Sequence, residues 1–471
     1  MEQWKPLSLS AFWQNQANYY KTQDKSIWQE TPHTVTNNAF IAKKMADICE
    51  SISPESPVIE IGSGIGEFAY HFCKHRQKPF EFLCTDYTKI NLQKLESLQD
   101  FNNWRYAYIH FHQLDCLNYQ PIPVKASSFP IFIFNYVFDT LPHDGFIKLA
   151  NNNIQTVLTC DAKNSADHDL IHLSSHHKLP FRTEKRPIHP LIEDYIKSHW
   201  ESAQQLTIPV GALNALAQIK KHHPKAIILF NDKTCQSPNA LSYQDGFGLQ
   251  KEGSVSCTVN THAIRHLFQP DFLLETPVDP TFDLNISTGL LGWGFAKNET
   301  RTINNAWMAH QQNTIYDYAL INRELALEQS KLSYPLIKRL LIQYNHDPYL
   351  FLNCTQNLYH HIHISNHLLH QDVRRILSKV KTQHFSQNDR LIPAISSCYR
   401  IMNDISSSEA LMRTYSLSNP KDYFYHKEMA QLQFIQKNHE EALAASAKAL
   451  LIKSDCKQMH SLHSQIKSMA K

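Results

Sequence analysis

Short, almost continuous apolar runs alternate with longer mixed segments between residues 58 and 149. The runs are VIEIG, FEFLCTD, YAYIHFHQLD and PIFIFNYVFD, and the segments EFAYHFCKH and KINLQKLESL separate the first three. Unbroken apolar runs are typical of strands that are buried on both faces of a sheet. Strands separated by helices predict right-handed crossovers and a parallel sheet. We therefore expect the order strand, helix, strand, helix, strand, strand.

The segments on either side of this region have other patterns. Residues 1–50 are polar and aromatic and end in AFIAKKMADICESI, whose apolar residues recur at helical spacing, so we expect a helical or lid segment there. Residues 150–224 are polar and contain two predicted helices, HPLIEDYIKSHW and VGALNALAQIKKHH. We expect them to form an inserted helical segment over one edge of the sheet. AIILFND then predicts another buried strand, and SVSCTVNT and FLLETPV predict the last strands.

The strand pattern stops after about residue 315, and helices separated by Asn, Pro and Ser are expected from there to residue 471. In NPKDYFYHKEMAQLQFIQKNHEEALAASAKALLIKSD, small residues stand at Ala430, Ala442 and Ala449. This unit resembles a tetratricopeptide repeat, in which small side chains let paired helices approach closely. The resemblance implies an all-α repeat domain that binds a protein substrate or partner. A helical cap without true repeats is the alternative.

These patterns predict an α/β protein with a doubly wound, Rossmann-like sheet, followed by a helical domain. The expected divisions are an N-terminal segment at 1–50, an α/β domain at 51–300 with its insertion at about 150–224, and a helical domain at 315–471.

Composition and charge narrow the function classes. The 471 residues are 42% hydrophobic and carry a formal net charge of +3, which gives no reason to expect a nucleic-acid or membrane partner. The ten cysteines are scattered without a CxxC pair, as expected for reduced thiols in a cytoplasmic protein. We identify no signal peptide and no apolar run of roughly eighteen residues that could span a membrane.

Histidine is common, with 28 residues, and is densest in YHHIHISNHLLH at 359–370. On one helix, His363 and His367 would share a face at the spacing of metal ligands. No Glu follows His363 as in HExxH, and the group contains no Cys, so a packed or solvated helical face is expected and no metal site is predicted.

Three of the chain's eleven glycines stand within five positions, in VIEIGSGIGEFA. Gly62, Gly64 and Gly66 follow an apolar strand and precede a helix, which is the context in which a glycine motif indicates a nucleotide-like ligand. Glycines in such a turn permit unusual backbone dihedrals and let a ligand approach bare main chain. The first N–H groups of the helix add free donors.

The spacing is GxGxG, not the GxGxxG of dinucleotide folds, so a nicotinamide-dependent dehydrogenase is a weak alternative. The absence of GK[ST] excludes a P-loop. With Glu60 two positions before the first glycine, Glu60-x-Gly62-x-Gly64-x-Gly66 resembles the first motif of class I S-adenosylmethionine-dependent methyltransferases.

The resemblance implies S-adenosyl-L-methionine as cofactor and a set of binding residues at the strand ends. Glu60 is expected near the methionine end of the ligand, Asp86 at the ribose hydroxyls and Asp115 at the adenine amino group. A helix cap is the alternative role for each lone aspartate. The expected cofactor-binding residues are Glu60, Gly62, Ser63, Gly64, Gly66, Asp86, Tyr87, Asp115, Cys116 and Asn135.

The segment PIFIFNYVFDTLPHDGF is similar to the NExxDALPV motif of MidA-type methyltransferases, which include the arginine methyltransferase that assists mitochondrial complex I assembly. The resemblance covers about residues 30–280, with further matches at 31–42 and in IPVGALNALAQI. It makes Asn135 and Asp139 the candidate catalytic residues; capping a helix near Thr140 is the alternative for Asp139. Tyr136 replaces the family's acidic residue, and Asn231-Asp232-Lys233 replaces its DYG.

We therefore expect a cytoplasmic S-adenosylmethionine-dependent methyltransferase that acts on a protein, with arginine as one candidate acceptor and the helical tail recruiting the target. The alternative is a catalytically degenerate methyltransferase fold that acts as a protein-binding scaffold through its helical repeats.

Overall fold

The computed structural model shows two compact units. One comprises residues 1–37 and 41–320, and the other comprises residues 38–40 and 321–471. The structure describes residues 4–22, 35–102, 104, 106–122, 129–160, 169–173, 178–201, 204–238, 245–252, 254–278, 285–327, 332–364, 367–386, 390–418 and 421–469.

The first unit is built on a sheet with the strand order β15-β16-β11-β5-β2-β3-β4. The five strands from β11 to β4 are parallel to their neighbours, whereas β16 is antiparallel to both β11 and β15. The strands are β2 (Val58–Ile61), β3 (Phe80–Asp86), β4 (Ala107–Gln113), β5 (Ile131–Asn135), β11 (Ala226–Cys235), β15 (Phe272–Glu275) and β16 (Ile286–Trp293).

The predicted order of strands and helices between residues 58 and 135 is confirmed, with α4 (Glu67–His75) and α5 (Lys89–Glu96) as the two helices. The apolar runs are buried on both faces in β2, β3 and β5, as their continuous pattern indicated. β4 differs because it pairs with β3 at the edge of the sheet, and its Tyr108 is 63% exposed.

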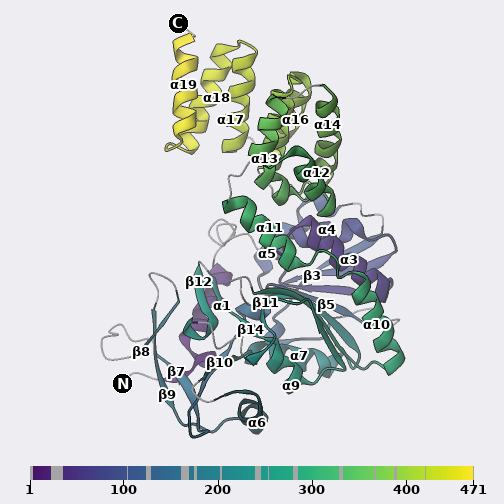
Figure 1. The fold of residues 1–471 in the computed structure, drawn as a ribbon, viewed down its shortest axis with the longest axis vertical. Helices are drawn as coiled ribbons and strands as arrows, with labels where there is room; N and C mark the ends of the chain where they lie inside the picture. Colours follow the sequence, from purple (N-terminus) through teal and green to yellow (C-terminus); the bar gives the residue numbers. More distant parts are fainter. Residues whose placement is uncertain are drawn as a thin grey trace. The chain divides into compact units, whose positions relative to one another are not determined.

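Helices cover both faces of this sheet (Figure 1). On one face lies α4, whose Phe72 ring is 5.3 Å from the Phe82 ring of β3. On the other lies α7 (Val210–His222), whose buried Ala215 and Ile219 belong to one apolar core with Phe132 of β5. The remaining helices that lie wholly in this unit are α1 (Ala11–Thr22), α6 (Pro190–His199), α9 (Thr261–Phe268) and α10 (Lys297–Ala309). α3 (Ala39–Ile52) and α11 (Ile315–Leu327) lie partly in each unit, because residues 39–40 and 321–327 belong to the second. Short 3₁₀ helices are η1 (Leu7–Leu9), η2 (Gln99–Phe101), η3 (Cys116–Asn118), η4 (Phe138–Thr140) and η5 (Asp245–Gly248).

The prediction of an inserted helical segment at 150–224 is wrong in its secondary structure. This region contributes to a second sheet of six strands, with the order β10-β6-β7-β9-β8 and β1 paired to β7. Its strands are β1 (Lys5–Pro6), β6 (Asp144–Lys148), β7 (Ile154–Thr159), β8 (Asp169–His172), β9 (Lys178–Glu184) and β10 (Gln204–Ile208). The six strands pair antiparallel. Several of their polar residues, such as Thr156, Thr159 and Thr207, are buried in the sheet, so the polar composition of the region did not indicate strands. α6 and α7 are both helices as predicted, and α7 packs on the main sheet.

The predicted final strands are partly wrong. FLLE forms β15 as expected, but β13 (Ser254–Cys257) pairs with β12 (Leu249–Glu252) in a separate hairpin, and the short β14 (Val259–Asn260) pairs with β11. The strand prediction missed β16, which lies between β11 and β15. Its Gly289 and Gly292 let two phenylalanine rings pack directly on the backbone of the strand. An added Cβ would lie 2.0 Å from Phe230 at Gly289 and 2.5 Å from Phe272 at Gly292.

The N-terminal helix α1 packs against the β13 hairpin. Gln16 Nε2 donates to the Val255 carbonyl (2.9 Å), and Gln16 Oε1 accepts from Val255 N–H (2.9 Å). Trp13 is buried in the apolar core beside the second sheet. The side chains of Tyr19 and Tyr20, considered for a lid over the site, lie outside the described residues, as do Thr31 to Thr34 of the segment at 31–42.

The second unit is helical throughout its described residues. Its helices are α12 (Tyr334–Gln343), α13 (Pro348–His363), α14 (His367–Thr382), α15 (Leu391–Ile401), α16 (Ile405–Ser418), α17 (Tyr423–Ile435), α18 (His439–Ile452) and α19 (Lys457–Met469). Ala430, Ala442 and Ala449 are fully buried, and Ala430 and Ala449 pack in one core with Met459 of α19. The small residues thus stand where helices meet; the tetratricopeptide assignment stays a prediction.

Within the described ranges, none of the helices is both long and apolar enough to cross a membrane.

Candidate functional site

The glycine turn between β2 and α4 has the unusual backbone that its sequence predicted. Gly62, Gly64 and Gly66 have φ values of 73°, 52° and 81°. Gly66 N–H donates to the Ser63 carbonyl (2.8 Å), and Ser63 N–H donates to the Thr85 carbonyl of β3 (2.8 Å). The turn is therefore tied to the end of the neighbouring strand while α4 begins directly after Gly66.

Asp86, the last residue of β3, fixes this turn. Its Oδ2 accepts from Gly64 N–H (3.1 Å), and its Oδ1 accepts from Thr88 N–H (2.8 Å), Thr88 Oγ1 (3.0 Å) and Asn91 Nδ2 (3.4 Å). Burial raises the pKa of Asp86, and these hydrogen bonds oppose the increase. A carboxylate has about four acceptor positions, so Oδ2 can still accept a further donor.

Glu60 lies on β2 just before the turn and is 1% exposed. Among the described residues, its Oε2 atom is buried without a hydrogen-bond partner. Burial raises the pKa of Glu60 to about 8, the nearby Ser63 hydroxyl opposes the increase, and the charge of Asp86 adds to it. A buried acceptor of this kind next to a bare turn is suited to a cationic or N–H-bearing ligand.

The three other predicted cofactor residues stand at the ends of β3 and β4. Asp115 caps η3: its Oδ1 accepts from Leu117 N–H (2.9 Å) and its Oδ2 accepts from Asn118 Nδ2 (2.7 Å). The capping alternative is thus observed for Asp115, although each oxygen keeps an unused acceptor position. Cys116 is buried and Tyr87 is half-buried.

Asn135 ends β5 and faces β11. Its Oδ1 accepts from Asn231 Nδ2 (3.1 Å), and the two residues are register partners in the parallel pairing of the strands. Asn231 Oδ1 in turn accepts from Thr288 Oγ1 of β16 (2.7 Å). The Asn135 amide is therefore held in one orientation at the carboxyl end of the sheet.

Asp139 forms a buried acidic pair with Asp232. The two carboxyls are 1% and 0% exposed. Asp139 does not cap η4; instead Asp232 Oδ2 accepts from Phe138 N–H (2.9 Å) and Asp139 N–H (3.4 Å) there. Burial raises the pKa of Asp139 to about 6, opposed by Lys233, and burial together with the Asp139 charge raises the pKa of Asp232 further. Burial and mutual repulsion thus disfavour a charge on both carboxyls at once.

Tyr136, between Asn135 and the acidic pair, has a left-handed backbone with φ of 59°. Its N–H donates to the Asn231 carbonyl (2.8 Å), and Lys233 Nζ lies 5.9 Å from the centre of its ring. Left-handed non-glycine residues persist where the surroundings enforce them and concentrate at functional sites. Asp232 and Lys233 were noted in the sequence only as departures from a motif, and the signal that could have found them is their position at the end of a buried strand.

These residues meet at one edge of the main sheet. The chain passes from β2 to β3 and β4 on one side, and then returns to β5 on the other side of β2. Ligands of open α/β sheets bind outside the carboxyl ends of the strands at such a change of direction. The glycine turn, Asp86 and Asn135 all stand there, and an added Cβ on Gly62 would lie 3.4 Å from Val137, so the β5 loop borders the turn.

The histidine-rich segment at 359–370 does not form the shared face considered in the sequence. His363 ends α13 and His367 begins α14, so the two residues are on different helices.

No protein-family profile matches the chain, and the sequence matches no curated protein. Two solved structures from Burkholderia thailandensis are similar to it. An uncharacterized protein gives a TM-score of 0.42 at 12% identity, with 62% of this chain and 88% of that chain covered. A protein of the same superfamily, suggested to be a methyl transferase and bound to S-adenosyl-homocysteine, gives a TM-score of 0.43 at 11% identity, with 62% and 89% covered. The function of this chain therefore has to be inferred from its own residues.

Proposed function

We propose that the protein is an S-adenosylmethionine-dependent methyltransferase. One observation carries the proposal: three left-handed glycines stand between β2 and α4 at the point where the strand order reverses, and Asp86 bonds the central glycine. This backbone offers close approach to a nucleotide-like ligand. The GxGxG spacing differs from the dinucleotide GxGxxG, and its resemblance to the first motif of class I methyltransferases supports S-adenosylmethionine. The Rossmann-like, doubly wound interpretation of the main sheet belongs to the same proposal.

The residues present fit the cofactor. Asp86 Oδ2 has acceptor capacity for ribose hydroxyls, and Glu60 Oε2 is a buried acceptor without a partner among the described residues, suited to the cationic methionine end. Asp115 is the candidate for the adenine amino group. S-adenosylmethionine, when bound, supplies an activated methyl group.

The chain's own residues would then position the methyl acceptor. The Asp139–Asp232 pair, in which a charge on both carboxyls at once is disfavoured, lies in a low-dielectric setting and favours a cationic or N–H-bearing acceptor. Asn135 supplies an oriented amide beside it. We propose a protein nitrogen as the acceptor, with arginine as one candidate because a guanidinium binds carboxylates in a bidentate manner. The helical unit is the proposed binding region for the target protein.

A catalytically inactive scaffold is the second candidate. It is favoured by the complete burial of Asp139 and Asp232, since an acceptor has to reach the group that orients it. In that case the helical unit would carry the function as a protein-binding module.

Calorimetry with S-adenosylhomocysteine tests cofactor binding. We expect the wild-type chain to bind, and Gly64→Arg to lose binding because the side chain would occupy the turn. Gly248→Arg is the matched control, since Gly248 also has a positive φ (68°) but is the last residue of η5, outside the glycine turn. Circular dichroism establishes that both variants are folded. A folded wild-type chain that binds no S-adenosylhomocysteine would contradict the proposal.

Transfer of a labelled methyl group to cell lysate distinguishes the enzyme from the scaffold. We expect Asp139→Asn to lower the methylation rate by about 100-fold while the affinity for S-adenosylhomocysteine is kept, because the acceptor alone is misplaced. Cofactor binding without a labelled product in any extract would favour the scaffold.

A further inference from the structure

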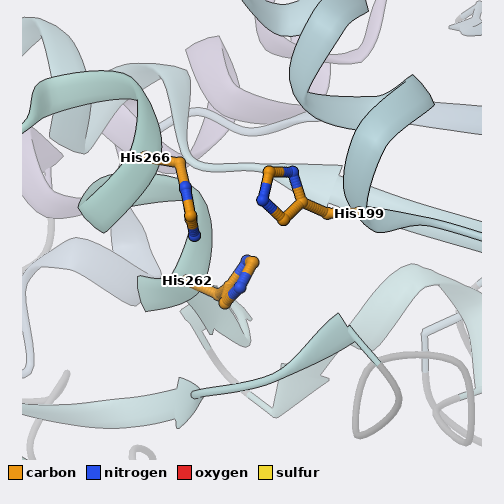
Figure 2. A group of neighbouring side chains, drawn as sticks. All are labelled: His199, His262 and His266. Atoms are coloured by element: carbon orange, nitrogen blue, oxygen red, sulfur yellow. The ribbon is translucent and has the colours of Figure 1, made fainter.

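Three histidines that are distant in the sequence lie together in the first unit, outside the site described above. His199 is the last residue of α6, and His262 and His266 are one turn apart on α9. Figure 2 shows the three rings gathered between the two helices. One potential ligand atom from each ring lies within 4.8 Å of the others, and the ring centres are 4.2 Å (His199–His266), 4.4 Å (His262–His266) and 5.2 Å (His199–His262) apart.

Hydrogen bonds to Tyr195 define which nitrogens are available. His199 Nδ1 is 3.1 Å from the Tyr195 carbonyl, which can only accept, so Nδ1 carries the proton and Nε2 keeps its lone pair. His262 Nδ1 is 3.0 Å from Tyr195 Oη, and Oη in turn can donate to Asn260 Oδ1 (3.5 Å). In that arrangement His262 Nδ1–H donates to Oη and its Nε2 is free. Metal-binding histidines are commonly oriented by such bonds from the second ring nitrogen.

Asn260 also fixes the helix that carries two of the histidines. Its Oδ1 caps α9 by accepting from Ala263 N–H (2.9 Å), and its Nδ2 donates to the Thr207 carbonyl of β10 (3.1 Å). Tyr195 and Ala263 are buried in one apolar core that joins α6 to α9. The backbone that presents the histidines is therefore set before any ligand binds.

The electrostatics suit a cation that imidazole binds. No hydrogen bond joins any two of the three rings within the described part of the chain, so no proton is shared between them. The cationic side chain of Arg265, between the two histidines of α9, reaches Glu275 instead (Nη2 to Oε2, 3.6 Å). Three neutral lone pairs without a carboxylate or thiolate favour a borderline transition metal over Mg²⁺ or Ca²⁺.

We propose that His199, His262 and His266 bind a Zn²⁺ ion that links α6 to α9. Three nitrogen ligands leave the fourth tetrahedral position to water or an anion. With Zn–N bonds of about 2.0–2.1 Å, tetrahedral ligand nitrogens are about 3.4 Å apart, so nitrogens that lie within 4.8 Å of one another have to approach by up to about 1.4 Å through side-chain rotation. The site is independent of the proposed methyl transfer.

Metal titration of the full-length chain, after dialysis against a chelator, tests the proposal. We expect one equivalent of Zn²⁺ by calorimetry, and a tetrahedral visible spectrum when Co²⁺ replaces it. His199→Gln and His266→Gln should each weaken Zn²⁺ binding at least about tenfold. His363→Gln is the matched control, because it removes an exposed histidine from the densest histidine segment of the chain, and it should change the affinity less than twofold.

Two outcomes would overturn the proposal: unchanged Zn²⁺ affinity in both ligand variants, or a wild-type chain that gives no tetrahedral Co²⁺ spectrum at one equivalent. The second measurement needs no variant, so the proposal is decided even if a substitution prevents folding. X-ray absorption of the zinc-loaded wild type should show three imidazole nitrogens; a first shell of oxygen would mean adventitious binding.

Discussion

Gly62 and Gly66 share a left-handed backbone, but their surroundings differ. An added Cβ on Gly66 would lie 2.6 Å from Leu95 and 2.9 Å from Phe101, whereas on Gly62 the nearest atom is Val137 Cγ2 at 3.4 Å. A non-glycine residue would strain the backbone at both positions, but it would clash with neighbouring side chains only at Gly66.

We therefore expect Gly66→Ala to lower the free energy of unfolding by about 2–4 kcal/mol and Gly62→Ala by about 1 kcal/mol. Urea denaturation followed by circular dichroism measures both. Equal decreases in the free energy of unfolding of the two variants would contradict the close packing of Leu95 and Phe101 on Gly66.

Glu60 gives a prediction about pH. Its pKa is raised to about 8 in the folded chain, against an ordinary value of about 4.3 in an unfolded chain. Between these two pKa values the folded state keeps Glu60 protonated while the unfolded state releases the proton. The free energy of unfolding therefore falls as the pH rises from about 4.3 to about 8.

Glu60→Gln removes this dependence, because glutamine imitates the protonated form at every pH. Relative to wild type, the variant should gain up to about 1.4 kcal/mol per pH unit between pH 5 and 8. Urea denaturation at several pH values gives the difference. Parallel stability curves for the two proteins would show that Glu60 ionises normally in the fold.

At the scale of elements, the packing of α17, α18 and α19 depends on small residues. Ala449 of α18 is fully buried in a core with Ala430 and Met459. A larger side chain has to push these helices apart, and overpacking of a core costs about 1–3 kcal/mol.

Ala449→Leu should therefore lower the free energy of unfolding of the helical unit by about 1–3 kcal/mol. Leu451→Ala on the same helix is the control: Leu451 is 85% exposed, and its replacement should change stability by less than about 0.5 kcal/mol. Chemical denaturation followed by far-ultraviolet circular dichroism is the measurement. A tolerated leucine at 449 would mean that the close approach of these helices is not required.

At the scale of the whole molecule, each of the two compact units has buried apolar residues of its own. A ligand at the glycine turn should stabilise the elements around it through mass action, by about 2.7 kcal/mol at a hundredfold excess over Kd. Amide hydrogen exchange should be measured with and without S-adenosylhomocysteine. With the ligand, exchange should be slower in Val58–Ile61 and Phe80–Asp86 and should change little in α17 to α19. Protection confined to the helical unit would place the ligand elsewhere.

The sequence predicted the β2–α4–β3–α5–β4–β5 order and the glycine turn because both depend on local features. A buried strand is recognised by an unbroken apolar run, and glycines directly after it permit the unusual backbone dihedrals of a tight turn. The second sheet was missed because its strands carry polar residues, and burial of Thr156, Thr159 and Thr207 depends on pairing with distant strands that a local pattern does not show. β16 was missed because its glycines, which serve close contact with Phe230 and Phe272, resemble breakers.

By itself, then, the sequence determined the helical C-terminal part, the parallel strands and the bend with bare main chain. Only the tertiary structure decided which distant side chains meet. Asp232 reaches the η4 backbone 94 positions earlier because β11 pairs with β5 in a register that aligns Asn231 with Asn135. His199 meets His262 and His266 because a shared apolar core packs α6 on α9. Hydrophobic periodicity records how much of each element is buried, but not which neighbour buries it.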